Sequence, residues 1–317
     1  MTTENKPYFS FEVLPPLRGK GIDSIYRTID RLMPFDPAYI NITTHRYDTL
    51  YSELANGTYK KLSVLNRPGT VAIAAAIKER YKVRTVPHIV CSGFTAAEIE
   101  SELIDLSYLG ITDLLLLRGD KAKSDNRFIP TPEGHAHAID LCQQINRFNN
   151  GQLLGGVQTE MLTEPFTYGV AGYPEKHDEA MNMETDIENL KAYIRLTREL
   201  DKEVAILAGN DGAILTCLKE GGAGGIAGRA NIWPETVAKI YDCFKAGDLE
   251  GAQAAQDAIA ILQQTFKYGN PNTIIKTAVA LQGHPVGKCR APFNYVPEEG
   301  MEAIKKVLAE NEAKGLH

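Results

Sequence analysis

The chain has 317 residues, of which 44% are hydrophobic and 23% charged, and its formal net charge at pH 7 is −6. A chain with this net negative charge is not expected to bind along the phosphate backbone of a nucleic acid. No apolar run approaches the roughly 20 residues that span a bilayer. Five widely spaced cysteines lack metal-ligand spacing, and no signal-peptide pattern is seen. The sequence therefore predicts a cytoplasmic protein with reduced thiols, no metal site, and no nucleic-acid or membrane partner.

The stretch Leu114–Asp120 shows a pattern that recurs along the chain. Four leucines predict a strand buried on both faces, and the run stops in Arg118, Gly119 and Asp120. Apolar strands with charged carboxyl ends are typical of β/α barrels, whose ligands lie at those ends. The other predicted strands are Tyr8–Pro16, Tyr39–Thr44, Val86–Cys91, Thr167–Glu175, Val204–Asp211 and Gly225–Asn231.

Helices are predicted between these strands, and residues 47–68 are expected to be irregular. The predicted helices are Ile22–Leu32, Thr70–Tyr81, Thr95–Leu109, Gly134–Asn149, Thr185–Glu199 and Gly212–Glu220. From Pro234 onward the pattern is helical throughout. We therefore predict an α/β protein: a TIM-type (β/α) barrel over residues 1–233 with C-terminal helices of residues 234–317 packed on it. Seven strands are recognisable, and Gly155–Leu162 is a weak candidate for the eighth.

Single residues at the strand ends have ordinary structural interpretations as well as functional ones. His88 lies inside an apolar strand, where a hydrogen-bonded core histidine is the usual reading. Glu12 lies in the apolar run of the first strand, so its carboxylate is either paired or functional, because burying it alone is costly. A carboxyl group whose pKa is raised by burial suits a proton donor. No lysine lies inside any of the seven predicted strands, which disfavours Schiff-base chemistry.

Residues 1–191 carry a series of motifs in order and at sensible spacing. They are Phe9-Ser-Phe-Glu12 followed by Pro15-Pro16, Pro87-His88, Leu117-Arg-Gly-Asp120, Gly169-Val-Ala-Gly-Tyr-Pro-Glu-Lys-His177, and Asp186 followed by Asn189-Leu-Lys191. Through these motifs this part of the chain closely resembles the methylenetetrahydrofolate reductase family, which consists of flavin-dependent β/α barrel enzymes.

The resemblance implies a role for each matching residue. Glu12 would be the acid that activates the folate. The implied FAD contacts are Thr43, His88, Leu117, Arg118, Asp120, Ala171, Tyr173, His177, Asp186 and Asn189. Arg118 and His177 suit phosphate or ribityl oxygens, and Asp120 suits tuning of the flavin's electronics. FAD as cofactor, NADH as reductant and a folate-type small molecule as substrate follow from the resemblance.

Beyond residue 191 the chain departs from the reductase pattern. The expected Thr-Gln-x-Phe-Phe-Asp motif, which supplies a substrate-binding glutamine, is absent, and Tyr193 stands where a lysine is expected. Residues 192–317 instead resemble the C-terminal part of the dihydrodipicolinate synthase / N-acetylneuraminate lyase family. The matching motifs are Val204-Ala-Ile-Leu-Ala-Gly-Asn-Asp211, Gly225-Ile-Ala-Gly with Ala230-Asn231, Ala246-Gly-Asp248, and Asn270-Pro-Asn with Lys276. In that family the catalytic lysine and tyrosine lie in the part of the sequence that precedes the matching segment, so residues 192–317 do not supply them.

The two resemblances together imply a recombined, engineered barrel. Residues 1–191 would supply five strands and residues 192–233 the last two, on one shared hydrophobic wall. We expect a scaffold that keeps much of the FAD site and has lost its native turnover. An active FAD-dependent reductase is the alternative, and a Schiff-base lyase or synthase is the least favoured. A barrel one strand short has two unpaired edges, so distortion or a homo-oligomer that covers the gap is expected.

Overall fold

The computed structural model describes residues 10–121, 125–159, 164–171, 181–182, 184–185 and 205–315. They belong to two compact units, one of residues 8–204 and one that contains residues 205–317. The buried apolar side chains of the described residues form two clusters, one in each unit. The expectation of one shared hydrophobic wall stays a prediction. The predicted division at residue 233 stays a prediction.

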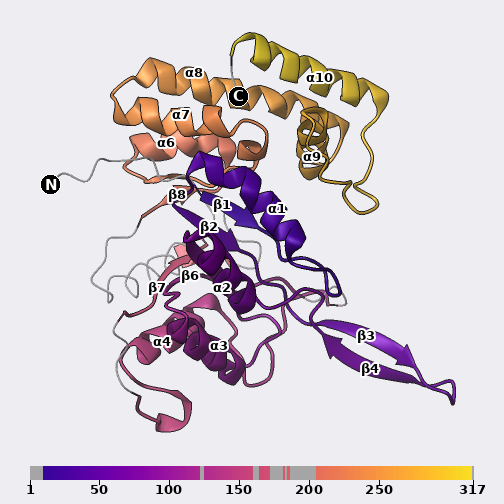
Figure 1. Ribbon diagram of the computed structural model, residues 1–317, viewed down its shortest axis with the longest axis vertical. Coiled ribbons are helices and arrows are strands. Elements are labelled where there is room, and N and C mark those ends of the chain that lie inside the picture. The colour runs from indigo at the N-terminus through magenta and orange to yellow at the C-terminus, as the bar shows by residue number, and fades with distance from the viewer. Residues whose placement is uncertain are drawn as a thin grey trace. The chain divides into compact units, whose positions relative to one another are not determined.

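The first unit is built on a five-stranded parallel sheet (Figure 1). Its strands, in the order in which they pair, are β1 (Ser10–Val13), β2 (Tyr39–Ile42), β5 (Arg84–Val90), β6 (Asp113–Leu117) and β7 (Thr167–Val170). All neighbouring pairs are parallel, so the carboxyl ends of the five strands lie at one edge of the sheet. The first five predicted strands are thus confirmed as strands, with altered bounds: β1, β2 and β7 are shorter than predicted, β5 begins two residues earlier, and β6 begins one residue earlier and ends three residues earlier. Residues 172–175 of the fifth prediction lie outside the described residues.

Four helices cover one face of this sheet. They are α1 (Asp23–Leu32), α2 (Thr70–Tyr81), α3 (Ala96–Tyr108) and α4 (Ala138–Asn149), with short 3₁₀ turns η1 (Met33–Phe35) and η2 (Leu154–Gly156). Their apolar stripes and the strand residues beneath them form the first hydrophobic core. Helix α3 begins with a capping box: Glu98 N–H donates to Thr95 Oγ1 at 3.1 Å, and Thr95 N–H donates to Glu98 at 2.8 Å. Helix α4 begins at Ala138, four residues later than predicted, where His137 N–H donates to Asp140.

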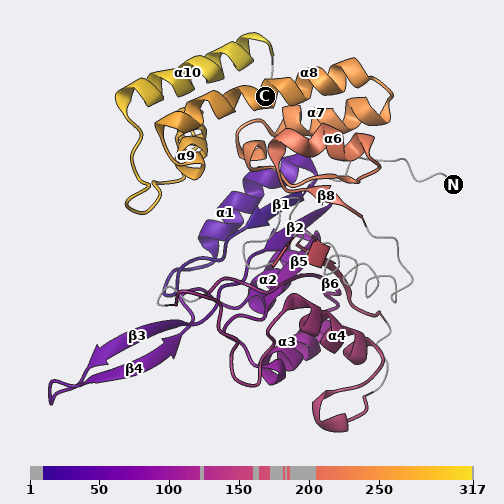
Figure 2. The same ribbon diagram turned by 180° about the vertical axis from the view of Figure 1, so that it is seen from behind.

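Residues 47–68 are not irregular, contrary to the prediction. Strands β3 (Asp48–Glu53) and β4 (Tyr59–Val64) pair antiparallel, and the ribbon extends away from the rest of its unit (Figures 1 and 2). Its polar residues alternate weakly with apolar ones, and Tyr51 and Tyr59 are 68% and 63% exposed. A ribbon with no buried face lacks the hydrophobic alternation by which strands are recognised.

The second unit consists mainly of helices. Its elements are β8 (Leu207–Ala208), η3 (Asp211–Ala213), α6 (Ile214–Lys219), β9 (Gly224–Gly225), η4 (Gly228–Asn231), α7 (Pro234–Lys245), α8 (Leu249–Ala260), η5 (Ile261–Tyr268), α9 (Pro271–Leu281) and α10 (Glu298–Ala313). Strands β8 and β9 pair in parallel, as the last two predicted strands require, but each has two residues. They are short because Asn210 Oδ1 accepts from Gly212 N–H, which starts a 3₁₀ turn, and a second turn begins at Gly228.

The C-terminal segment is helical from Pro234 onward, as predicted, and two of its helices have side-chain N-caps. Asp248 accepts from Gly251 N–H and Asn270 from Asn272 N–H, so both act as N-caps. Trp233, Ile240 and Ile259 are buried in the second core. Leu281, the last residue of α9, is 37% exposed. No helix among the described residues has the length and hydropathy needed to cross a membrane.

Two predictions concern segments that are described only in part. Of the candidate eighth strand, residues 155–159 are described, and they contribute no strand to the sheet. Of the helix predicted at Thr185–Glu199, which would carry the join, residues 186–199 lie outside the described residues.

Candidate functional site

The face of the five-stranded sheet that α1–α4 leave uncovered carries polar side chains towards its carboxyl edge. Glu12 pairs in register with Asn41, and Asn41 pairs with Val86, two residues before His88. Because register partners in a parallel sheet point to the same side, Glu12, Asn41 and His88 share one face. The opposite face is apolar and buried under the helices. The polar groups are thus gathered where a β/α fold binds its ligands.

Glu12 and His88 lie close together on this face. Nε2 of His88 is 3.9 Å from Oε2 of Glu12, and their side chains are 5% and 50% exposed. Burial lowers the pKa of His88 to about 4, so the imidazole is neutral at pH 7. Partial burial also raises the pKa of Glu12. At 3.9 Å the contact is too long for a hydrogen bond, and a neutral imidazole makes no ion pair. The sequence-based idea that Glu12 is buried is wrong: half of its side chain faces solvent, which leaves the carboxyl group accessible.

Two buried polar atoms at this edge have no hydrogen-bond partner among the described residues. They are Nε2 of His88 and Oγ1 of Thr43. Thr43 follows β2 and its N–H donates to Val13 O at 3.1 Å, so its backbone is fixed beside β1. Thr44 Oγ1 donates to the carbonyl of His88, which ties the ends of β2 and β5 together. Since buried polar atoms are nearly always paired, an unpaired nitrogen and hydroxyl next to a carboxyl group fit a polar ligand that would satisfy them.

The loops that follow β2, β5 and β6 are joined by a second set of contacts. Ser92 Oγ donates to Asp120 O at 2.7 Å, and Arg46 Nη1 donates to Ser92 Oγ at 3.2 Å and to Asp120 O at 3.5 Å. The guanidinium of Arg118 lies over the ring of Phe128, 4.7 Å from its centroid. The edge therefore presents cationic, hydroxyl and carboxyl groups on loops that contact one another.

The structure describes seven of the eleven predicted site residues. Those described are Glu12, Thr43, His88, Leu117, Arg118, Asp120 and Ala171, and all lie in or directly after β1, β2, β5, β6 or β7. Tyr173, His177, Asp186 and Asn189 lie outside the described residues, so their roles stay predictions. Within the described set, Glu12 and His88 are brought close together, whereas Arg118 and Asp120 belong to the adjoining loop.

Sequence reasoning missed three polar residues at this edge: Asn41, Arg46 and Ser92. Asn41 is 7% exposed and neighbours Glu12 in register. Asn41 lies two residues from both Tyr39 and Thr43, so the alternation of side chains along a strand puts all three on one face. This pattern could have identified Asn41 from the sequence. Arg46 and Ser92 directly follow strands, which marks them as edge residues, but their contact spans 46 positions and nothing local predicts it.

A depression at the opposite, amino-terminal end of the strands is a weaker candidate. It has a volume of about 400 Å³ and is lined in part by Lys78, Arg84 and Asp113. Arg84 forms an ion pair with Asp113, and Lys78 Nζ donates to Leu109 O at 2.9 Å and Gly110 O at 2.6 Å. These charged groups already have partners within the protein. Among the described lining residues, Thr85 has a buried hydroxyl without a hydrogen-bond partner, so the depression offers one such atom where the other edge offers two.

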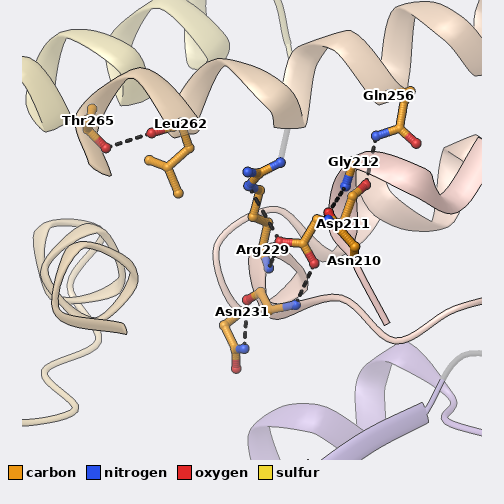
Figure 3. A network of polar contacts seen from close by, with 9 residues as sticks. Asn210, Asp211, Gly212, Arg229, Asn231, Gln256, Leu262 and Thr265 are labelled. Carbon is orange, nitrogen blue, oxygen red and sulfur yellow. Dashed lines mark hydrogen bonds and ion pairs between the residues drawn. The ribbon is translucent and has the colours of Figure 1, made fainter. Parts of the chain in front are cut away.

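The second unit has a polar network of its own after β8 and β9 (Figure 3). Asp211 accepts from Gly228 N–H at 2.8 Å and from Arg229 N–H at 3.2 Å, and Oδ2 lies 3.4 Å from Nε of Arg229. Gln256 Nε2 donates to Asp211 O at 2.8 Å. Arg229 is 4% exposed, and burial lowers its pKa while Asp211 opposes the shift. The network holds the β9 loop against α8, and we assign it a structural role.

Comparison with protein families divides the chain as the motifs do. The methylenetetrahydrofolate reductase model matches residues 1–196, and the dihydrodipicolinate synthetase family model matches residues 179–311. Both predicted resemblances are thereby confirmed. The overlap of the two matches, residues 179–196, includes the predicted position of the join near residue 192.

Individual relatives agree with this division. Methylenetetrahydrofolate reductase (NADH) 1 of Zea mays is 29% identical over 181 residues, which are 57% of this chain and 26% of the maize protein. A 4-hydroxy-tetrahydrodipicolinate synthase of Methanoculleus marisnigri is 34% identical over 123 residues, which are 39% of this chain and 42% of that protein. The chain thus spans about a quarter of the length of the curated reductase and less than half of the synthase.

Solved structures show the fold. N-acetylneuraminate lyase from Fusobacterium nucleatum matches with a TM-score of 0.60 at 15% identity, over 96% of this chain and 98% of the lyase chain. The α/β fold with parallel strands and alternating helices is therefore of the TIM-barrel type, as predicted. With 196 of its 317 residues matched, the chain belongs to the methylenetetrahydrofolate reductase family, and it continues into a segment that matches the dihydrodipicolinate synthetase family model.

Proposed function

We propose that the chain is a flavin-binding recombinant of the two families that has lost folate reduction. The observation that carries the proposal is a pair of buried atoms, His88 Nε2 and Thr43 Oγ1, that have no hydrogen-bond partner among the described residues; His88 Nε2 lies 3.9 Å from the accessible carboxyl group of Glu12. Hydroxyl, imidazole and guanidinium groups are donors that suit the oxygens and ring nitrogens of FAD. A bound flavin would supply hydride transfer, with NADH as the reductant.

Each described residue has a task in this proposal. Thr43 and His88 would hydrogen-bond the cofactor with the atoms now left unpaired, and Arg118 would contact its anionic or ribityl part. Partial burial raises the pKa of the Glu12 carboxyl group, and this group is the one that would protonate a substrate in a chain that kept its turnover. His88, neutral at pH 7, would not repel a cationic group formed there.

Loss of turnover follows from what the second segment leaves out. The Thr-Gln-x-Phe-Phe-Asp motif implied by the reductase resemblance is absent from the sequence, so the folate-binding glutamine is missing. We therefore expect neither folate reduction with NADH nor a defined folate complex. An engineered origin of the join also stays a prediction; the change of family within residues 179–196 favours recombination.

A flavin titration tests the proposal. We expect the purified protein to quench the fluorescence of added FAD in a saturable way and to melt at a higher temperature with FAD than without it. Thr43→Val should weaken binding about tenfold, because one hydrogen bond is lost. Thr85→Val is the matched control, since Thr85 Oγ1 is also buried and unpaired but lies on the helix-covered face. No quenching and no thermal shift would refute the proposal.

Two activity measurements distinguish the alternatives. Oxidation of NADH coupled to a folate would show that the active-reductase alternative is right and that turnover survives. Trapping of a pyruvate adduct with borohydride would support the Schiff-base alternative. We expect neither result. We expect no pyruvate adduct because a Schiff base needs a lysine, and no parallel strand among the described residues carries one.

A further inference from the structure

Arg46 and Ser92 connect three loops that are far apart in the sequence. Ser92, after β5, donates its hydroxyl to the carbonyl of Asp120, after β6, at 2.7 Å. Arg46, after β2, reaches both partners through Nη1, at 3.2 Å to Ser92 Oγ and 3.5 Å to Asp120 O. The Asp120 carbonyl thus accepts from two side chains that come from two other strand ends.

The backbones of these loops also approach closely, and glycines stand at the points of contact. Gly119 has φ of +81°, and a Cβ added there would lie 2.8 Å from Ser92 Cβ. Gly93 has φ of +86°, and its added Cβ would lie 3.0 Å from Arg46 Cβ. Positive φ and lack of space each favour glycine at both positions. The two side chains therefore act across loops that are already in direct contact.

Hydrogen bonding continues past the ends of β5 and β6. Cys91 N–H donates to Leu117 O at 3.1 Å, and Ser92 N–H donates to Arg118 O at 2.9 Å. The two side-chain contacts to Asp120 O add to these backbone bonds. The carbonyl groups of Leu117, Arg118 and Asp120 thus all accept hydrogen bonds from the neighbouring loops. The conformation of residues 117–120 is thereby fixed by groups outside that segment.

We propose that Arg46 and Ser92 are positioning residues that hold the Arg118–Asp120 loop in its binding conformation before any ligand arrives. The role in cofactor binding rests on the proposed function, because Arg118 and Asp120 are the FAD contacts implied by the reductase resemblance. A loop ordered in advance loses little conformational entropy when it binds, so its affinity is higher. Neither residue needs to touch the cofactor.

The test uses the full chain and two matched pairs of variants. Arg46→Met and Ser92→Ala remove the donors. Lys78→Met is the control for Arg46→Met, because Lys78 also donates to two loop carbonyls but at the other end of the sheet. Ser107→Ala is the control for Ser92→Ala, because Ser107 Oγ donates to Ile104 O at 2.7 Å within α3. Arg46→Lys keeps a cationic donor and serves as the conservative rescue.

Two readouts are compared across these variants. We expect amide hydrogen exchange at residues 91–92 and 117–120 to accelerate about tenfold in Arg46→Met and Ser92→Ala, with Arg46→Lys in between and both controls like the parent. The FAD dissociation constant should rise about tenfold in the same two variants. Melting temperatures should not separate them from the controls, which distinguishes positioning from general stabilisation.

The outcomes separate the two proposals. If exchange in Arg46→Met and Ser92→Ala matches the controls, the positioning role is wrong, whether or not FAD binds. If exchange accelerates but FAD affinity is unchanged, the link to binding is wrong. If the parent protein binds no FAD while exchange accelerates as expected, the proposed function fails and the ordering role of Arg46 and Ser92 stands.

Discussion

Nε2 of His88 lies 3.9 Å from Oε2 of Glu12, on neighbouring positions of one sheet face but on strands that are not adjacent. The imidazole is almost fully buried and the carboxyl group is half exposed. Burial lowers the pKa of the first and raises that of the second, so both shifts favour the uncharged forms. The pair is therefore not a buried ion pair, because the imidazole is neutral at pH 7, and its properties depend on pH.

We expect the protein to lose stability as the pH falls from 6.5 to 4 because of His88. Its pKa is about 4 in the folded protein, against an ordinary value of 6.5, so in that window the unfolded chain binds a proton that the folded protein does not. The loss amounts to at most about 3 kcal/mol. His88→Gln, which cannot titrate, should flatten this part of the profile. Urea unfolding at pH 4.5, 5.5 and 6.5 measures it; equal slopes in parent and variant would contradict the burial effect.

Glu102 should act in the opposite direction over a similar range. Burial, together with Glu98 and Asp105, raises its pKa from 4.5 to about 7. Between these pH values the unfolded chain loses the proton first, so stability contributed by Glu102 falls as the pH rises. Glu102→Gln should stabilise the protein at pH 8 by about 1–2 kcal/mol, allowing for solvent screening of a partly buried side chain.

The control for Glu102 is Glu53→Gln on the exposed β3–β4 ribbon. This variant should leave the free energy of unfolding at pH 8 unchanged. Thermal melts of the three proteins at pH 5 and pH 8 show whether the gain from Glu102→Gln appears only at the higher pH. A gain of equal size at both pH values would show that charge on Glu102 is not its cause.

Loss of the capping box should weaken the first unit through α3. Thr95→Ala removes the acceptor for Glu98 N–H, which then has no side-chain partner at the first turn. The expected cost is about 1 kcal/mol. Thr28→Ala is the matched control, because Thr28 Oγ1 donates to Ser24 O in α1 and caps nothing. Chemical denaturation should place Thr95→Ala below the parent and Thr28→Ala at or slightly above it, since alanine favours helix.

The Asp211–Arg229 pair should show strong coupling in a double-mutant cycle. Asp211→Asn leaves the buried guanidinium without its counter-charge and should cost about 3 kcal/mol or more. Arg229→Met together with Asp211→Asn should cost clearly less than the two single changes added together. The cycle is measured by urea unfolding monitored through the fluorescence of Trp233, which is buried in the same core.

An exposed ion pair of the same unit provides the comparison. Lys305 Nζ lies 2.7 Å from Glu302 Oε1, with side chains 53% and 67% exposed. Glu302→Gln should cost less than about 1 kcal/mol, because solvent screens the pair. If Asp211→Asn is as mild as Glu302→Gln, the buried network does not hold the β9 loop as the geometry suggests.

The sequence by itself determined the succession of elements and the change of family. The helices over residues 70–81 and 96–108 and the parallel strands were predictable because hydrophobic periodicity, N-caps and chain-breaking prolines act within a few residues. The strands around Glu12 and His88, and hence their place at the candidate site, were predictable for the same reason. The motifs also located the join near residue 192, within the overlap of the two family matches.

Only the tertiary structure decided which of these groups meet. The sheet order puts Glu12 within reach of His88, and loop packing puts Arg46 against Ser92 and Asp120, at separations of 46 and 74 positions. The β3–β4 ribbon likewise had no local signal. The physical reason is that burial and hydrogen bonding between distant segments depend on strand pairing and packing, which short-range patterns do not encode.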